Sequence, residues 1–135
     1  MNWTIDFTRE FARGAKILKK RYKSFMSDLE SFKVNIANNP FQGVELVPGI
    51  RKIRLPIGSK QKGKSGGARV ITLTYYVSEE EGKIHFLIIY DKSDTDSVDV
   101  KVVQKYVAEL GFNLQEFQEQ GMLTPKAEDK TMSDK

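Results

Sequence analysis

The chain has 135 residues, of which 22 are Lys or Arg and 18 are Asp or Glu, and its formal net charge at pH 7 is +4. This length predicts one domain with an ordinary hydrophobic core. The absence of cysteine excludes disulfides, zinc–thiolate sites and cysteine nucleophiles. The N-terminus lacks the pattern of a signal peptide, and the longest apolar run, Phe86–Tyr90, is far too short to span a bilayer. We therefore expect a cytoplasmic protein without membrane association.

The N-terminal residues predict a strand followed by a helix. Trp3–Phe7 alternates apolar and polar residues, which is the period of a half-buried strand. Thr8 suits a helix N-cap, and apolar residues then recur at helical spacing from Phe11 to Tyr22. The cations of Lys19–Arg21 fall in the last turns, where they complement the helix dipole.

A second helix is predicted to begin at Ser24 or at Ser27, and Glu30 would complete a capping box with Ser27. Apolar residues recur from Leu29 to Ile36. Pro40 ends the helix, because the residue before a proline avoids helical backbone. The short connection predicts that the two helices form an antiparallel hairpin.

Three strands are predicted next. Ile50–Ile57 has apolar residues on one face, and Pro56, which cannot donate a ladder hydrogen bond, predicts an edge strand. Val70–Val77 and Ile84–Tyr90 are apolar on both faces in part, which is typical of central strands. Glu81–Gly82 predicts the hairpin turn between them.

A third helix is predicted from Ser97 or Asp99, either of which would cap it, to Gly111. Phe112–Leu123 has no clear period, and the polar residues 124–135 are expected to be disordered beyond a single domain at 1–123. The predicted order is β-α-α-β-β-β-α. This is an α+β fold in which the helical hairpin and the C-terminal helix pack on a small antiparallel sheet.

Residues Gly58–Ser65 read GSKQKGKS and fit the pattern of a phosphate-binding P-loop. A P-loop requires a helix directly after the loop, because the helix N-terminus holds the phosphates. Here Gly66 and Gly67 follow, which are poor residues for a first helical turn, and then come the strand-forming residues of Val70–Val77. The context therefore argues against a nucleotide cofactor.

Charge is distributed unevenly along the chain. No acidic residue lies between Glu45 and Glu79, so all 18 Asp and Glu residues lie outside this interval. A segment of one sign is typical of proteins that bind a phosphate backbone, which favours RNA as a partner. For Lys60–Lys64 the alternative is a solvated, flexible hairpin loop, because charge runs usually form exposed faces. The cations of the interval are Arg51, Lys52, Arg54, Lys60, Lys62, Lys64 and Arg69.

Three segments share a pattern with one known family. They are GIRKIR at 49–54, GKSGGARVITLTYYV at 63–77 and IHFLIIYDKSDTDSV at 84–98. Together, after a helical hairpin, they resemble the RelE/ParE superfamily of bacterial toxins, most closely its RelE/HigB branch, over Phe7 to about Leu110. The resemblance implies the toxin of a type II toxin–antitoxin pair, with a cognate antitoxin as partner. Most RelE-like members cleave mRNA on the ribosome, whereas ParE-like members inhibit DNA gyrase.

RNA cleavage without metal or cofactor uses the RNA's own 2′-OH to attack the adjacent phosphate. It needs a group that takes the 2′ proton, a cation for the phosphoryl charge and an acid for the leaving oxygen. Arg69 is the candidate cation, because a guanidinium binds phosphate bidentately, and it matches the family's arginine at the start of this strand. Lys92 matches a cationic position of RelE-like enzymes. Tyr90 would stack on a base or donate a proton, and Asp91 would be a general base.

Other interpretations of these residues stay open. Arg69 alone is equally consistent with an ion-paired arginine, and Tyr90 with core packing. His85, the one histidine of the chain, shares strand parity with Leu87 and Ile89, which favours a structural role. The chain has neither the loop histidines nor the C-terminal tyrosine of some relatives, so the identity of the general base stays open. The expected RNA-binding residues are Arg51, Arg54, Lys60, Lys62 and Lys64.

Overall fold

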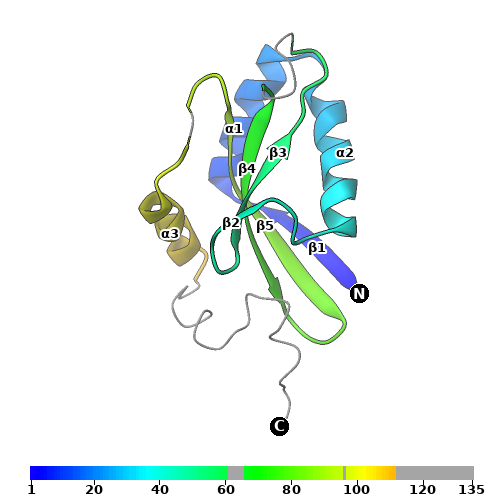
Figure 1. Cartoon of the computed structure of the whole chain (residues 1–135), viewed down its shortest axis with the longest axis vertical. Coiled ribbons are helices and arrows are strands. Elements are labelled where there is room, and N and C mark those ends of the chain that lie inside the picture. The colour runs from blue at the N-terminus through cyan, green and yellow to red at the C-terminus, as the bar shows by residue number, and fades with distance from the viewer. Residues whose placement is uncertain (61–65, 96, 112–135) are drawn as a thin grey trace.

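The computed structural model describes residues 1–60, 66–95 and 97–111 (Figure 1). Within these residues the chain forms an α+β fold with one mixed sheet and three helices, which confirms the predicted class. The expected boundary at residue 123 and the tail at 124–135 lie outside the described residues. The elements are β1 Asn2–Phe7, α1 Arg9–Arg21, α2 Phe25–Asn38, β2 Val44–Val47, β3 Ile50–Leu55, β4 Ala68–Tyr76, β5 Glu81–Asp91 and α3 Val100–Glu109.

The strand order across the sheet is β1-β5-β4-β3-β2. Neighbouring strands are antiparallel, as predicted, except at one edge, where β1 runs parallel to β5. The prediction of a purely antiparallel sheet is therefore wrong at β1, because α1 and α2 connect this strand to the rest of the sheet and no tight turn joins it to β5. β4 and β5 are central strands, as their apolar residues on both faces predicted. The first and last strands in the sequence thus lie side by side.

Strand β2 was not predicted, and it corrects the place of β3 in the sheet. Val44 pairs with Lys52 and Val47 with Ile50, so β3 has a neighbour on each side and is not the edge strand that Pro56 suggested. Pro56 lies just beyond the last residue of β3, where it disturbs no ladder. The turn dipeptide Pro48–Gly49, with Gly49 at φ 89°, was the sequence signal for this hairpin.

The sheet separates two hydrophobic cores. The helical hairpin of α1 and α2 packs on one face and contributes Phe11, Phe25 and Phe32 to the first core. Helix α3 contributes Val103 and Val107 to the second core, on the opposite face. Figure 1 shows α3 standing apart from α2, with the strands between them.

A β-bulge in β5 reverses the side-chain alternation before the end of that strand. Ile71 pairs with Ile88 but Thr72 pairs with Phe86, so Leu87 is the extra residue. Leu87 packs in the core under α3, whereas Ile89 packs in the core under the helical hairpin. The prediction that residues 85, 87 and 89 share one face of the sheet is therefore wrong for Ile89.

His85 lies in the middle of the sheet, as its strand pattern predicted. Its Nε2 is 3.0 Å from the hydroxyl of Tyr75, and the two rings stack at 5.6 Å. Burial lowers the pKa of His85, and Lys83 adds to this effect while Asp6 opposes it. The neutral ring is therefore favoured.

The predicted helix starts and turns were partly right. Thr8 caps α1 by accepting a hydrogen bond from the backbone N–H of Phe11, and Asp99 caps α3 through Lys101. The capping box of Ser27 and Glu30 is wrong, because α2 already begins at Phe25. The β4–β5 turn occupies residues 77–80, and Gly82 lies inside β5, under the Trp3 ring.

Candidate functional site

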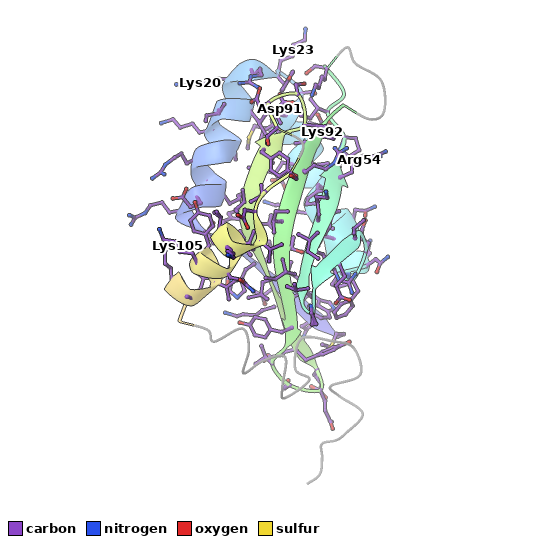
Figure 2. All side chains as sticks on the ribbon, turned by 60° about the vertical axis from the view of Figure 1, so that its left-hand side comes forward. Lys20, Lys23, Arg54, Asp91, Lys92 and Lys105 are labelled. Atoms are coloured by element: carbon purple, nitrogen blue, oxygen red, sulfur yellow. The ribbon has the colours of Figure 1, made fainter. Side chains whose placement is uncertain are left out.

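Residues from three strands meet at the end of the sheet where β3 and β5 finish and β4 begins. In register, Arg54 lies opposite Arg69, and Arg69 lies opposite Tyr90. One step further, Ala68 lies opposite Asp91. Since neighbouring residues of a strand point to opposite faces, the first three side chains share the face of α3, and Asp91 points to the helical hairpin. Figure 2 shows Arg54, Asp91 and Lys92 together at this end.

The bulge at Leu87 decides this division. Without the extra residue, Asp91 would share a face with Leu87 and Tyr90 would share one with Phe86. The bulge instead directs Asp91 toward the helical hairpin and Tyr90 toward the opposite face. Bulges that redirect a side chain in this way are frequent next to functional sites.

Arg69 is held by the backbone that leads into its own strand. Only 8% of the residue is exposed, and Nη1 donates to the carbonyl oxygens of Gly66 and Ala68, both at 3.1 Å. These bonds fix the plane of the guanidinium at the beginning of β4. A planar guanidinium with a set orientation is suited to bidentate contact with a phosphate.

Arg69 lines a pocket of about 350 Å³ beside the part of β3 that extends past β2. Among the described lining residues three are cations and none is acidic. Like charges directly opposite each other destabilise a sheet, so an anion bound between Arg54 and Arg69 would relieve their repulsion. The lining is Gln42, Gly43, Val44, Lys52, Ile53, Arg54 and Arg69.

Asp91 is the centre of a buried polar cluster on the other face. Its side chain is 1% exposed. Oδ2 accepts hydrogen bonds from Tyr22 at 2.6 Å and from Arg21 at 2.8 Å, and Oδ1 accepts from Lys60 Nζ at 2.6 Å and from the backbone N–H of Ser93 at 2.9 Å. The carboxylate thereby joins α1, β5 and the segment after β3.

These contacts make Asp91 a poor proton acceptor. Burial by itself would raise the pKa of Asp91, but hydrogen bonds from Lys60, Tyr22, Ser93 and Arg21 outweigh burial and hold this pKa well below its ordinary value. A general base works best with a pKa near the working pH. The geometry thus disfavours the general-base role expected of Asp91.

Lys60 is an internal residue. Its side chain is 5% exposed, and Nζ donates to Asp91 and, at 3.2 Å, to the carbonyl oxygen of Gly67. Its ammonium group also lies 5.7 Å from the centre of the Tyr22 ring. Lys60 therefore fixes the backbone here and does not present a surface charge. Lys62 and Lys64, the other two lysines expected to bind RNA, lie outside the described residues.

The segment before Lys60 is also fixed, by the start of α2. Ser24 Oγ donates to Asp28 at 2.7 Å and accepts from the backbone N–H of Ser59 at 2.8 Å. Gly58 donates its N–H to Asp28 at 2.9 Å. The polar side chains at the start of α2 thus hold the segment after β3 instead of capping the helix.

Tyr90 and Lys92 complete the site at the end of β5. Tyr90 packs against the core under α3, and Lys92 donates its backbone N–H to the Gly67 carbonyl at 3.1 Å. The same carbonyl accepts from Lys60, so Gly67 links the two segments. Gly67 has φ 58°, and a Cβ there would lie 2.7 Å from the Leu55 carbonyl oxygen, which requires glycine.

Arg51 lies away from these residues, on the face of the helical hairpin. It pairs with Glu45 at 3.5 Å, and its guanidinium lies 5.6 Å from the centre of the Phe41 ring. The side chain is 13% exposed. This packing gives Arg51 a structural role at the β2–β3 hairpin and separates it from the pocket of Arg54 and Arg69.

Sequence reasoning did not predict that the end of the first helix contacts Asp91. Arg21 and Tyr22 end α1 and reach Asp91, and burial together with Asp91 raises the pKa of the Tyr22 hydroxyl. Lys52 was recognised as a cation but was not assigned to a site. The alternation of charges in β3 was the signal for Lys52, whereas Arg21 and Asp91 are 70 positions apart in the sequence and no local pattern joins them.

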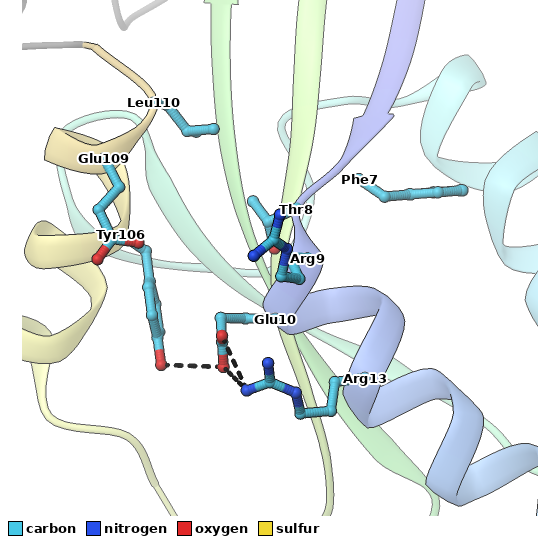
Figure 3. Close-up of a pocket in the computed structure, with 8 residues that line it drawn as sticks. All are labelled: Phe7, Thr8, Arg9, Glu10, Arg13, Tyr106, Glu109 and Leu110. Carbon is cyan, nitrogen blue, oxygen red and sulfur yellow. Dashed lines mark hydrogen bonds and ion pairs between the residues drawn. The ribbon is translucent and has the colours of Figure 1, made fainter.

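A second pocket lies between the start of α1 and the end of α3 (Figure 3). Here the charges are mixed and partly paired: Arg13 bonds Glu10 at 3.1 Å, and the Tyr106 hydroxyl donates to Glu10 at 3.3 Å. Glu109 also lines the pocket. Carboxylates at this position make it unsuited to a phosphate backbone.

A scan against models of known protein families finds no match for this chain. Helices long and apolar enough to cross a membrane are absent from the described residues. The described residues also contain no group of three or more His, Cys, Asp or Glu side chains placed to hold a metal ion.

Proposed function

We propose that the chain is the toxin of a type II toxin–antitoxin system, a ribosome-dependent endoribonuclease that cleaves mRNA through attack by the RNA's own 2′-OH. The observation that supports this most is the pocket in which Arg54 lies opposite Arg69 and Lys52 adds a third cation. A site of this charge suits a phosphodiester, whose charge increases on the phosphoryl oxygens in the transition state.

In this proposal the residues around the pocket have separate roles. Arg69 stabilises the phosphoryl oxygens, and Arg54 and Lys52 hold the phosphates on either side. Tyr90, directly opposite Arg69, stacks on a base or transfers a proton, and Lys92 assists from the end of the same strand. The cognate antitoxin would inhibit the enzyme by covering this cationic pocket with acidic residues.

The test is expression of wild type and Arg69→Ala in bacterial cells, followed by mapping of mRNA ends. We expect wild type to stop growth and to produce cuts in translated reading frames. Arg69→Ala should reduce cutting by on the order of 100-fold or more, as for other losses of a group that stabilises transition-state charge. Arg13→Ala, which changes an exposed arginine of the second pocket, is the matched control and should cut like wild type.

Equal cutting by wild type and Arg69→Ala would reject the proposed site. Growth arrest with a loss of DNA supercoiling and without mRNA cuts would reject the nuclease and support a gyrase inhibitor of ParE type. A chain that neither stops growth nor cuts RNA would also contradict the proposal.

A further inference from the structure

We propose that Asp91 is a positioning residue for Arg69 and acts through Lys60 and the carbonyl groups of Gly66 and Gly67. This inference rests on the proposed function for its kinetic consequence, but the contacts that support it are independent of that function. It assigns Asp91 and Lys60, expected from the sequence to act on RNA directly, to the support of the arginine.

The first step is the saturation of the Asp91 carboxylate. A carboxylate has about four lone-pair positions. Described donors occupy both oxygens twice, Arg21 and Tyr22 at Oδ2 and Lys60 and Ser93 at Oδ1. With 1% of the side chain exposed, Asp91 can approach an RNA 2′-OH only after the cluster separates.

The second step is the link through Lys60 by which Asp91 fixes the backbone before β4. Asp91 orients the ammonium group of Lys60, which also donates to the Gly67 carbonyl. That carbonyl accepts in addition from the backbone N–H of Lys92. Two donors from different segments therefore hold the carbonyl of Gly67. Without them, the backbone of the adjacent glycines Gly66 and Gly67 would be free to rotate.

The third step reaches the guanidinium. The carbonyl of Gly66, one residue before, accepts from Arg69 Nη1 at 3.1 Å. A rotation of the Gly66–Gly67 backbone would move this acceptor and with it the guanidinium. Arg69 and Asp91 are on opposite faces of the sheet, so the effect of Asp91 passes through Lys60 and the two glycines and not through direct contact.

The test uses Asp91→Asn, Lys60→Met and the double variant of the full chain, with Asp94→Asn as the matched control. Asp94 also forms an ion pair with Arg21, at 2.9 Å, but its side chain is 56% exposed. Within the described residues, Arg21 is its one ion-pair partner. The first readout is the NMR signal of the Arg69 Nε–H group in each purified protein, beside the backbone amide spectrum that reports folding.

We expect the Arg69 signal to shift in both single variants and in the double variant, and to stay in place in Asp94→Asn. Lys60→Met keeps the length of the side chain and leaves Asp91 intact, so it tests the path even if Asp91→Asn fails to fold. An unchanged Arg69 signal in a folded Lys60→Met protein would overturn the inference, whatever the chain does to RNA.

The second readout is cleavage of mRNA on programmed ribosomes. Misplacement of Arg69 should lower kcat by between about 10- and 100-fold with little change in KM. The double variant should be no slower than the slower single variant, because both changes interrupt one path. The pH profile of Asp91→Asn should keep the shape of the wild-type profile.

Two results together would overturn the inference: an Asp91→Asn pH profile that lacks the acidic limb, and full activity in Lys60→Met. They would support Asp91 as the general base. Absence of cleavage by wild type would reject the proposed function alone, because the Arg69 signal still reports the positioning. The two failures are thus distinguished by different measurements.

Discussion

The two ends of the β4–β5 hairpin are packed differently: aromatic rings cover the end with the turn, and charged side chains surround the opposite end. At the turn, Trp3 lies 5.6 Å from Phe41 and 5.5 Å from Tyr76 between ring centres, and Gly82 leaves room for the indole. At the open end, Asp91 is surrounded by Arg21, Tyr22 and Lys60. Both ends join segments that are distant in sequence.

The two ends differ in how their stability depends on single groups. Contacts between rings are numerous and individually weak, so they tolerate adjustment. A buried ion pair depends on every partner, because removal of one leaves a desolvated charge without compensation. The charged end is therefore the more fragile of the two, and it is also the end where Arg54, Arg69 and Tyr90 meet.

The largest expected effect is at the charged end. Asp91→Ala should lower the free energy of unfolding by about 3–5 kcal/mol, because it leaves the ammonium of Lys60 buried without its partner. Urea denaturation at pH 7 measures the change. Asp94→Ala, which removes an exposed carboxylate of the same cluster, should change it by less than about 1 kcal/mol.

The same comparison has a pH dependence. Because the hydrogen bonds to Asp91 hold its pKa below the ordinary 3.8, its contribution to stability is present above that pH and is lost as the pH falls through the folded-state pKa. The difference in free energy of unfolding between wild type and Asp91→Ala should therefore become smaller at acidic pH. A difference that stays constant would contradict the strong ionic contribution assigned to Asp91.

An intermediate effect is expected at the aromatic end. In Gly82→Ala the new Cβ would overlap the Trp3 ring, which Phe41 and Tyr76 hold in place, so the free energy of unfolding should fall by about 1–3 kcal/mol. Thermal and urea unfolding measure it. Gly58→Ala is the control, since the nearest atom to its Cβ would be at 3.7 Å, an ordinary contact, and the change should stay within about 1 kcal/mol. Equal losses in both variants would show that the indole does not restrict residue 82.

The smallest expected effect lies between the two ends, at His85. Burial beside Tyr75 lowers the pKa of His85 relative to its ordinary 6.5, so the unfolded chain binds this proton first. The contribution of His85 to the free energy of unfolding is complete above pH 6.5 and declines as the pH falls below 6.5. Urea midpoints at pH 7.5 and 5.5 should differ less in His85→Gln than in wild type. Asp6 and Lys83, the charged groups that act on His85, are unchanged in this variant. An equal pH difference in both proteins would assign the effect to other groups.

Local patterns were sufficient for the helices and the central strands. The N-caps Thr8 and Asp99, the helical period of α1 and the apolar runs of β4 and β5 each follow from interactions within a few residues of the chain. Gly66 and Gly67 lead directly into β4, as predicted, and not into the helix that a P-loop requires. A four-residue strand such as β2 gives too short a pattern to recognise without its turn.

The sequence by itself determined the α+β class, the acid-free cationic segment and the position of Arg69 at the start of a strand. Only the tertiary structure decided which charges face solvent and which face each other. One extra residue at Leu87 directs Asp91 to the helical hairpin, and Arg21 reaches it across 70 positions of the chain. Burial and hydrogen bonding depend on such long-range packing, so Lys60 is internal and Arg51 structural although their side chains are as cationic as that of Arg54.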